Sequence, residues 1–246
     1  VRRVEGTRYS ATEGDRGYKL SRQLEKGYRT EQELVAERDS LLMETAGKSL
    51  VDAMEYLAKS VNSPFEKLLA NNIVKLIKRM ENAGFSFDYK IVDIKGNIQP
   101  KGLRGLTTVS KDNNVVVSLA ATDDALSADN GVNHQTLLHE GVHAVTLAAT
   151  TAVRRGLLPD GLKLKQDVKD LFDLFDGIIS YFNSQIAELD AGRISEEELH
   201  PVISTYYRRN EATSPNFLNN ADELLAWGLT DSEMQDFLDT VPYNMR

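Results

Sequence analysis

The stretch NHQTLLHEGVHAVTLAATTAVRRG, residues 133–156, carries the strongest pattern in this chain of 246 residues. Asn133 is a residue type that caps helix starts, and Gly156 permits the left-handed backbone that ends many helices. Two arginines precede that glycine, where cations suit the negative end of a helix dipole. Between these signals, apolar residues cover several faces: Leu137, Leu138, Val142, Val145 and Leu147. The sequence therefore predicts one mostly buried helix over residues 133–155.

Two of the chain's four histidines lie in this helix, in the run His139-Glu140-Gly141-Val142-His143. Positions i and i+4 lie one turn apart on the same face, so both imidazoles can bind one metal ion. Glu140 lies beside them, where a carboxylate can activate a water molecule. The pattern H-E-x-x-H is typical of zinc peptidases, and the alternative is a surface helix that carries two histidines by accident. His134 lies five residues before His139, so we expect a first-turn polar residue and not a ligand.

The composition limits the kinds of site that this chain can hold. It has no cysteine, which excludes both disulfides and thiolate zinc sites, so a metal must be held by histidine and carboxylate. The net charge of −8 argues against a nucleic-acid-binding surface. No apolar run reaches membrane-spanning length, and the first residues do not have the pattern of a secretion signal, so we expect neither a membrane span nor secretion. A start at Val1 indicates a fragment of a larger polypeptide or a processed product.

In the N-terminal third of the chain, the pattern of apolar and polar residues changes near residue 30. Residues 1–30 are polar with little apolar periodicity, which predicts an arm or linker. Helical periodicity follows over residues 31–84, with a break at Gly47 and a second helix that begins at Pro64. We expect these helices to pack on the core of the protein.

Strand patterns lead directly into the histidine helix. Residues 85–94 alternate apolar and polar side chains, and further strands are predicted within 102–110 and at Val115–Leu119. The turn signal Asp112-Asn113-Asn114 predicts that the second and third strands form a hairpin. We expect Val115–Leu119 to be an edge strand that could align an extended substrate.

Several helices are predicted after the histidine helix. An apolar stripe over residues 165–190 indicates core packing, and Ser195 with Glu198 forms a capping box for a helix that Pro201 can shorten. A further helix is predicted from Ala221, and Asp231 is a candidate cap for a last one.

A catalytic zinc ion usually takes three protein ligands, so one more is needed. His200 is one candidate, and a downstream carboxylate is the other. Glu223 lies near the start of the helix that begins at Ala221. There a glutamate is also favoured simply by the helix dipole. Asp222 is interpreted as an ordinary first-turn acid.

The two motifs together resemble a known family. H-E-x-x-H followed downstream by N-x-x-x-E-φ-φ-A, here Asn219 to Ala226, is similar to gluzincins. The resemblance is closest to the metallopeptidase domains of phage polyvalent proteins and more distant to the anthrax lethal factor catalytic domain. It covers residues 85–240, and residues 229–238 also resemble the segment that follows in those domains. The resemblance implies that Glu223 is the third ligand of a zinc ion held by His139 and His143.

The resemblance also implies a fold. It predicts an α+β, zincin-like protein with a small, mostly antiparallel sheet packed on the H-E-x-x-H helix and a mainly helical remainder. The metallopeptidase domain would span residues 85–246, with a helical insertion at about 160–207. That insertion makes the spacing from His143 to Glu223 longer than in compact members.

Two further positions depart from the family pattern. Many members carry another glutamate where this chain has Trp227, its only tryptophan, which either walls the site or packs in the core. A tyrosine that stabilises the oxyanion often precedes the ligand glutamate, but Asn216 and Phe217 occupy that region here. Tyr206 or Tyr207 is the candidate substitute.

The function expected from this resemblance is a zinc-dependent endopeptidase with Glu140 as general base and a protein or peptide as substrate. A phage or mobile-element protein in the bacterial cytoplasm or the phage virion is the expected setting. The alternative is a structural or protein-interaction module that keeps a zincin fold without efficient catalysis. Two histidines and one glutamate also accept divalent ions other than zinc.

Overall fold

The computed structural model describes residues 30–93, 104–127, 130–158, 163–208, 218 and 220–242. The chain divides into two compact units, Val1–Ala148 and Ala149–Arg246, and the division falls inside helix α5 (His134–Arg154). The arm expected at residues 1–30 lies outside the described residues except for Thr30, and so do Asn216 and Phe217.

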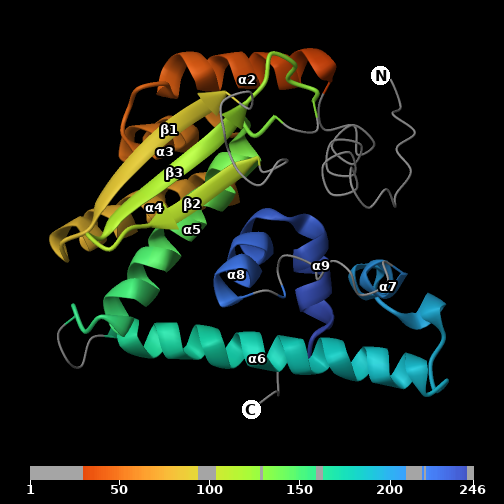
Figure 1. Cartoon of the computed structure of the whole chain (residues 1–246). Coiled ribbons are helices and arrows are strands. Elements are labelled where there is room, and N and C mark those ends of the chain that lie inside the picture. Colours follow the sequence, from red (N-terminus) through yellow and green to blue (C-terminus); the bar gives the residue numbers. More distant parts are fainter. Residues whose placement is uncertain are drawn as a thin grey trace. The chain divides into compact units, whose positions relative to one another are not determined.

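The first unit begins with helices and continues with a sheet (Figure 1). Thr30 and Ser49 each cap a helix through a side-chain oxygen, and Gly47 has φ +73° between those two helices, as expected for the break. Pro64 occupies the first turn of the third helix, where a missing N–H costs nothing. The elements before α5 are α2 (Glu31–Thr45), α3 (Leu50–Ser60), α4 (Pro64–Asn82), β1 (Ser86–Asp93), β2 (Gly105–Val109) and β3 (Asn114–Ala121).

The sheet has the order β1-β3-β2 and is mixed. Strands β2 and β3 form the expected antiparallel hairpin, with Thr107 opposite Val117 and Asn113 at φ 60° in the turn. Strand β1 pairs with β3 in parallel, so the prediction of a mostly antiparallel sheet is wrong. The prediction that Val115–Leu119 is an edge strand is also wrong, because β3 bonds to a neighbour on both sides. Its nearly continuous apolar run is what a central strand carries.

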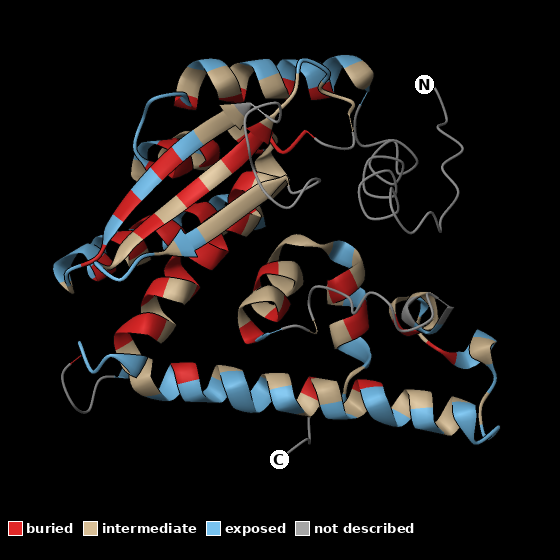
Figure 2. Cartoon of the chain, viewed as in Figure 1, coloured by how far each residue is buried: buried red, intermediate tan, exposed pale blue. Residues whose placement is uncertain are grey.

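One face of the sheet forms the core of the first unit (Figure 2). The register places Phe87 of β1 beside Val115 of β3, and Tyr89 beside Val117, and all four side chains are buried. The helices contribute a second set of fully buried apolar side chains: Leu41, Leu50, Met54, Leu57, Ile73 and Ile77. At roughly 25 cal/mol per Å² of apolar surface, this burial is the main favourable term for the unit.

A glycine inside the histidine motif allows α5 to approach the neighbouring helices. A Cβ on Gly141 would lie 2.5 Å from the terminal methyl of Met54 and 3.3 Å from Cδ1 of Ile73. A contact of 2.5 Å is shorter than real Cβ contacts, so a larger residue at this position would require the end of the Met54 side chain to move. The H-E-x-x-H motif therefore contributes to helix packing in the core, in addition to carrying the two histidines.

The second unit is helical over the residues that the structure describes. Its elements are α6 (Lys163–Asp190), the 3₁₀ turn η2 (Glu196–Glu198), α7 (Pro201–Arg208), α8 (Ala221–Thr230) and α9 (Ser232–Thr240). The capping pair Ser195 and Glu198 opens the short turn, and Pro201 begins a separate helix instead of shortening one. The core of this unit is Ile178, Phe182, Leu199, Ile203, Leu224, Met234 and Phe237.

The two helices near the C-terminus begin as predicted. Asn220 accepts a hydrogen bond from the N–H of Glu223 at the start of α8, and Asp231 accepts from Glu233 and Met234 at the start of α9. Over the residues that the structure describes, the chain is thus α+β and mainly helical, with one small mixed sheet. Among the described helices, none is both long and apolar enough to cross a membrane.

The segment that leads into α5 is tied to the end of the sheet. The N–H of Gly131 donates to the carbonyl of Ala120 at 2.7 Å, and the N–H of Ala120 donates to the carbonyl of Arg104, also at 2.7 Å. The side-chain oxygen of buried Asn130 accepts from the N–H of Val132 at 2.9 Å. These bonds place the start of α5 relative to β2 and β3.

Replacing Gly131 with alanine should destabilise the first unit. The added Cβ would overlap the carbonyl oxygen of Arg104, a main-chain atom that cannot rotate away. We expect a loss at the upper end of the about 1–3 kcal/mol typical of overpacking, measured by urea unfolding. Gly228→Ala is the control, because its Cβ would meet only a side-chain methyl of Leu238. Equal losses in the two variants would contradict this account.

Candidate metal centre

The first turn of α5 is held by two acceptors from outside the helix. The side-chain oxygen of Asn133 accepts from the N–H of Thr136 at 2.8 Å, and the carboxylate of Glu37 in α2 accepts from the N–H of His134 at 2.7 Å. Both bonds satisfy N–H groups that a helix start otherwise leaves unpaired. Glu37 is buried, and its second oxygen lies 3.5 Å from Nδ1 of His134. His134 is therefore a first-turn residue, as predicted, and its pairing with α2 is an addition from the structure.

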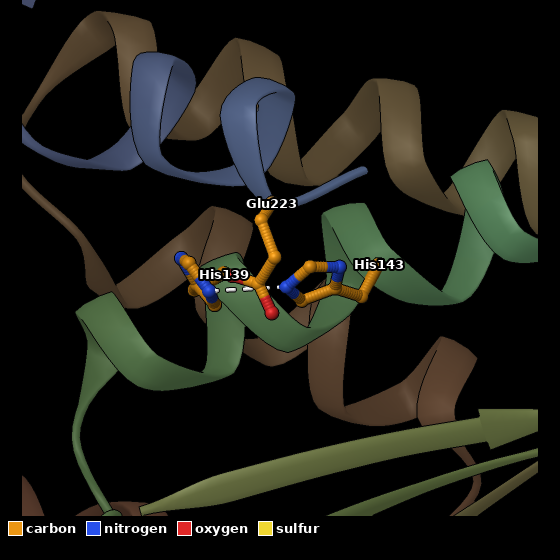
Figure 3. Close-up of side chains that lie close together, drawn as sticks. All are labelled: His139, His143 and Glu223. Atoms are coloured by element: carbon orange, nitrogen blue, oxygen red, sulfur yellow. Dashed lines mark hydrogen bonds between the residues drawn. The ribbon is translucent and has the colours of Figure 1, made fainter. Parts of the chain in front are cut away.

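His139 and His143 lie on one face of α5, as the i, i+4 spacing predicted (Figure 3). Their Nε2 atoms are 3.1 Å apart, and the rings meet edge to face at 75° with centroids 4.8 Å apart. Two nitrogens bound to one tetrahedral zinc ion at about 2.0–2.1 Å lie about 3.3 Å from each other. The observed separation, at which the two rings also share a hydrogen bond, is close to the one that a common metal ion would need.

Glu140 is nearly buried, at 6% exposure, between the helix and strand β2. The hydroxyl of Thr107 in β2 donates to its carboxylate at 2.6 Å and also lies 3.2 Å from its main-chain oxygen. A hydroxyl has one proton, so the shorter contact to the carboxylate receives it. A buried carboxylate needs such donors, because an uncompensated charge is costly away from water.

Strand β2 also provides the space for Glu140. A Cβ on Gly105 would lie 2.5 Å from Cγ and Oε1 of Glu140. Gly105 and Thr107 are two residues apart on the strand, so they present the same face of the sheet to the carboxylate. Neither residue was predicted from the sequence to belong to the site. Which side chain a strand presents to a helix depends on helix–sheet packing, and the local pattern carries no signal of it.

Glu223, the candidate third ligand, lies in the second unit, and hydrogen bonds hold both its main chain and its carboxylate. Its N–H donates to the side chain of Asn220 at 2.8 Å, and its Oε2 accepts from the indole N–H of Trp227 at 3.1 Å. Figure 3 draws this side chain with the two histidines. The bond to Trp227 was not predicted, although the i, i+4 spacing of the two residues was a usable signal.

The other candidates have partners within the second unit. His200 accepts from the N–H of Val202 through Nδ1 at 3.2 Å and packs on Phe237 with ring centroids 5.5 Å apart. Burial lowers the pKa of His200, so its neutral form is favoured. These contacts describe a helix-start residue of α7 and give no support to His200 as the third ligand.

Both candidate tyrosines lie in α7, and the structure describes the side chain of one of them, Tyr207. Tyr207 is exposed, and its hydroxyl donates to Asp190 at the end of α6 at 3.0 Å. That hydrogen bond raises the pKa of Tyr207. A role in stabilising an oxyanion would require the hydroxyl to leave Asp190. The side chain of Tyr206 lies outside the described residues.

Thr107→Val tests whether the hydroxyl supports the buried carboxylate. The change keeps the shape and the strand propensity but removes the donor to Glu140, so we expect a loss of about 1–3 kcal/mol in unfolding free energy. Thr108→Val, at the neighbouring exposed position on the same strand, is the matched control and should change little. Urea unfolding of the metal-free proteins measures both. A Thr107→Val protein as stable as the control would contradict the assignment.

No family model, curated protein or solved structure matches this chain. The similarity to gluzincins therefore rests on the two sequence motifs.

Proposed function

We propose that this protein is a zinc-dependent endopeptidase in which Glu140 is the general base. The observation that carries the proposal is the pair of imidazole nitrogens 3.1 Å apart on α5. A buried carboxylate lies next to that pair in the sequence and is held by Thr107. Two histidines separated by one helical turn, with a glutamate between them, are what this chemistry needs.

We further propose that Glu223 completes the ligand set. His139, His143 and Glu223 each offer one ligand atom, an imidazole nitrogen or a carboxylate oxygen (Figure 3). Catalytic zinc sites commonly use three such N and O ligands and keep a position for water. Glu223 belongs to a different unit from the histidines, so a variant of Glu223 tests its part in metal binding separately from theirs.

The proposed reaction is hydrolysis of a peptide bond. Zinc, when bound, polarises the carbonyl oxygen and lowers the pKa of a water molecule. Glu140 accepts a proton from that water as the water oxygen bonds to the carbonyl carbon. Glu140 then donates the same proton to the amide nitrogen as the C–N bond breaks. Water is thereby divided between a new carboxyl group and a new amine, and Glu140 returns to its charged form.

Strand β2 is the proposed element for aligning the substrate. Among the described strands it pairs on one side only, with β3, and it contacts Glu140 through Thr107. An extended peptide can add to such an edge by main-chain hydrogen bonds, which would bring its carbonyl groups past the general base. The proposed substrate is therefore an unfolded or extended protein segment. The motif resemblance adds the proposal that the chain is part of a phage or mobile-element protein.

Zinc binding should depend on the three proposed ligands. Equilibrium dialysis of protein stripped by chelator should give one zinc per wild-type chain. His139→Ala and Glu223→Ala should each weaken binding by more than the 10–100-fold typical of losing an outer-shell partner. His200→Ala is the control and should bind zinc as the wild type does. Absence of zinc binding by the wild type, or an equal loss in the His200 variant, would contradict the proposed site.

Glu140→Gln should keep zinc binding and lose hydrolysis. The amide preserves the shape of the side chain but cannot accept the proton from water, and loss of a general base typically costs about 10²–10⁴-fold in rate. The measurement is mass spectrometry of new N-termini after incubation of zinc-loaded protein with casein, an unstructured substrate. A zinc-loaded wild type that generates no more new N-termini than the Gln variant would favour the interaction-module alternative.

A further inference from the structure

We propose that Trp227 is a positioning residue whose indole N–H orients the carboxylate of Glu223 for metal binding. The inference rests on the proposed function, because it assigns a role toward the same zinc ion. Trp227 is not one of the three proposed ligands. It would hydrogen-bond to one of them, and the resemblance to gluzincins does not predict this role. In the gluzincin pattern, a second glutamate often occupies this position instead.

The geometry of α8 brings the two side chains together. Glu223 and Trp227 are four residues apart, so they share one face of the helix, and Nε1 of Trp227 lies 3.1 Å from Oε2 of Glu223. An indole N–H is a donor only, so its partner must be an acceptor such as this carboxylate oxygen. The carboxylate keeps further lone pairs for a metal after it accepts this bond.

The indole can hold the carboxylate because its own position is restricted. Trp227 is partly buried and packs against the core cluster of the second unit, which includes the buried Leu224 and Phe237. The backbone of Glu223 is held separately, through the bond from its N–H to Asn220. With both the main chain and the carboxylate engaged, few rotamers of Glu223 remain, and less side-chain entropy is lost when a metal binds.

The position of Trp227 also makes tryptophan fluorescence a probe of the environment of Glu223. Trp227 is the only tryptophan in the chain, so the whole tryptophan emission comes from the side chain that donates to Glu223. A metal ion that binds the carboxylate changes the electric field at the indole. Zinc addition should therefore shift or quench the emission of the wild-type protein.

The test is a double-mutant cycle on zinc affinity. Trp227→Phe keeps an aromatic ring in the core but removes the N–H donor. Zinc dissociation constants of the wild type, Trp227→Phe, Glu223→Ala and the double variant are measured by competition with a chelating dye. We expect Trp227→Phe to weaken binding about 10–100-fold, as loss of an outer-shell partner does. In the Glu223→Ala background the same change should have no further effect, because Trp227 acts through that carboxylate.

Two results would overturn the inference and leave the zinc site standing. One is a Trp227→Phe protein that binds zinc as tightly as the wild type. The other is an equal loss of affinity with and without Glu223, which is what a purely structural role of the ring would produce. If the wild type binds no zinc, the proposed function fails, and this inference fails with it.

A second measurement applies even if Trp227→Phe does not fold. Zinc titration of the wild type, followed by tryptophan emission, should give a saturable change that is absent in Glu223→Ala. An unchanged emission at saturating zinc, with zinc binding established by dialysis, would show that the metal does not bind the carboxylate held by Trp227.

Discussion

The hydrogen bond from Thr107 to the buried carboxylate of Glu140 joins the sheet of this protein to its histidine helix. A carboxylate so far from water is tolerated only with a donor beside it, and an edge strand supplies that donor. Glycines allow the close approach of Glu140 to strand β2 and two other close approaches in the first unit. Gly105 leaves room for the carboxylate, Gly141 lets α5 approach α3 and α4, and Gly131 lets the segment before α5 pass close to Arg104. At Gly131 an added side chain would meet main-chain atoms, whereas at Gly105 and Gly141 it would meet side chains that would have to move.

In each unit, hydrogen bonds within that unit restrict the segment that carries the candidate ligands. In the first, the start of α5 is held by Asn133 and Glu37, and the two imidazoles one and two turns later have a separation suited to one metal ion. In the second, Glu223 is held by Asn220 and Trp227. Residues whose positions are already restricted lose less conformational entropy when a metal binds.

Local sequence signals predicted the elements well because caps, glycines and periodicity act over a few residues. The histidine helix expected at 133–155 spans 134–154, and the breaks at Gly47 and Pro64 lie where the sequence placed them. The order of strands was not predictable in this way. Parallel pairing of β1 with β3 joins residues distant in sequence, and a buried apolar run gives no sign of which strands flank it. Within the candidate site, the spacing of His139 and His143 was enough to predict their shared face. The contact of Thr107 with Glu140 depends on packing between a helix and a sheet, which a local pattern does not encode.

The central claim is that His139, His143 and Glu223 bind one metal ion together. The most direct measurement is the crystal structure of the zinc-loaded protein, with anomalous diffraction recorded on both sides of the zinc absorption edge. We predict one strong anomalous peak about 2.0–2.1 Å from both imidazole Nε2 atoms and about 2.0–2.2 Å from an oxygen of Glu223. A zinc peak at any other group of side chains, or a peak at the histidines with a different third ligand, would contradict it.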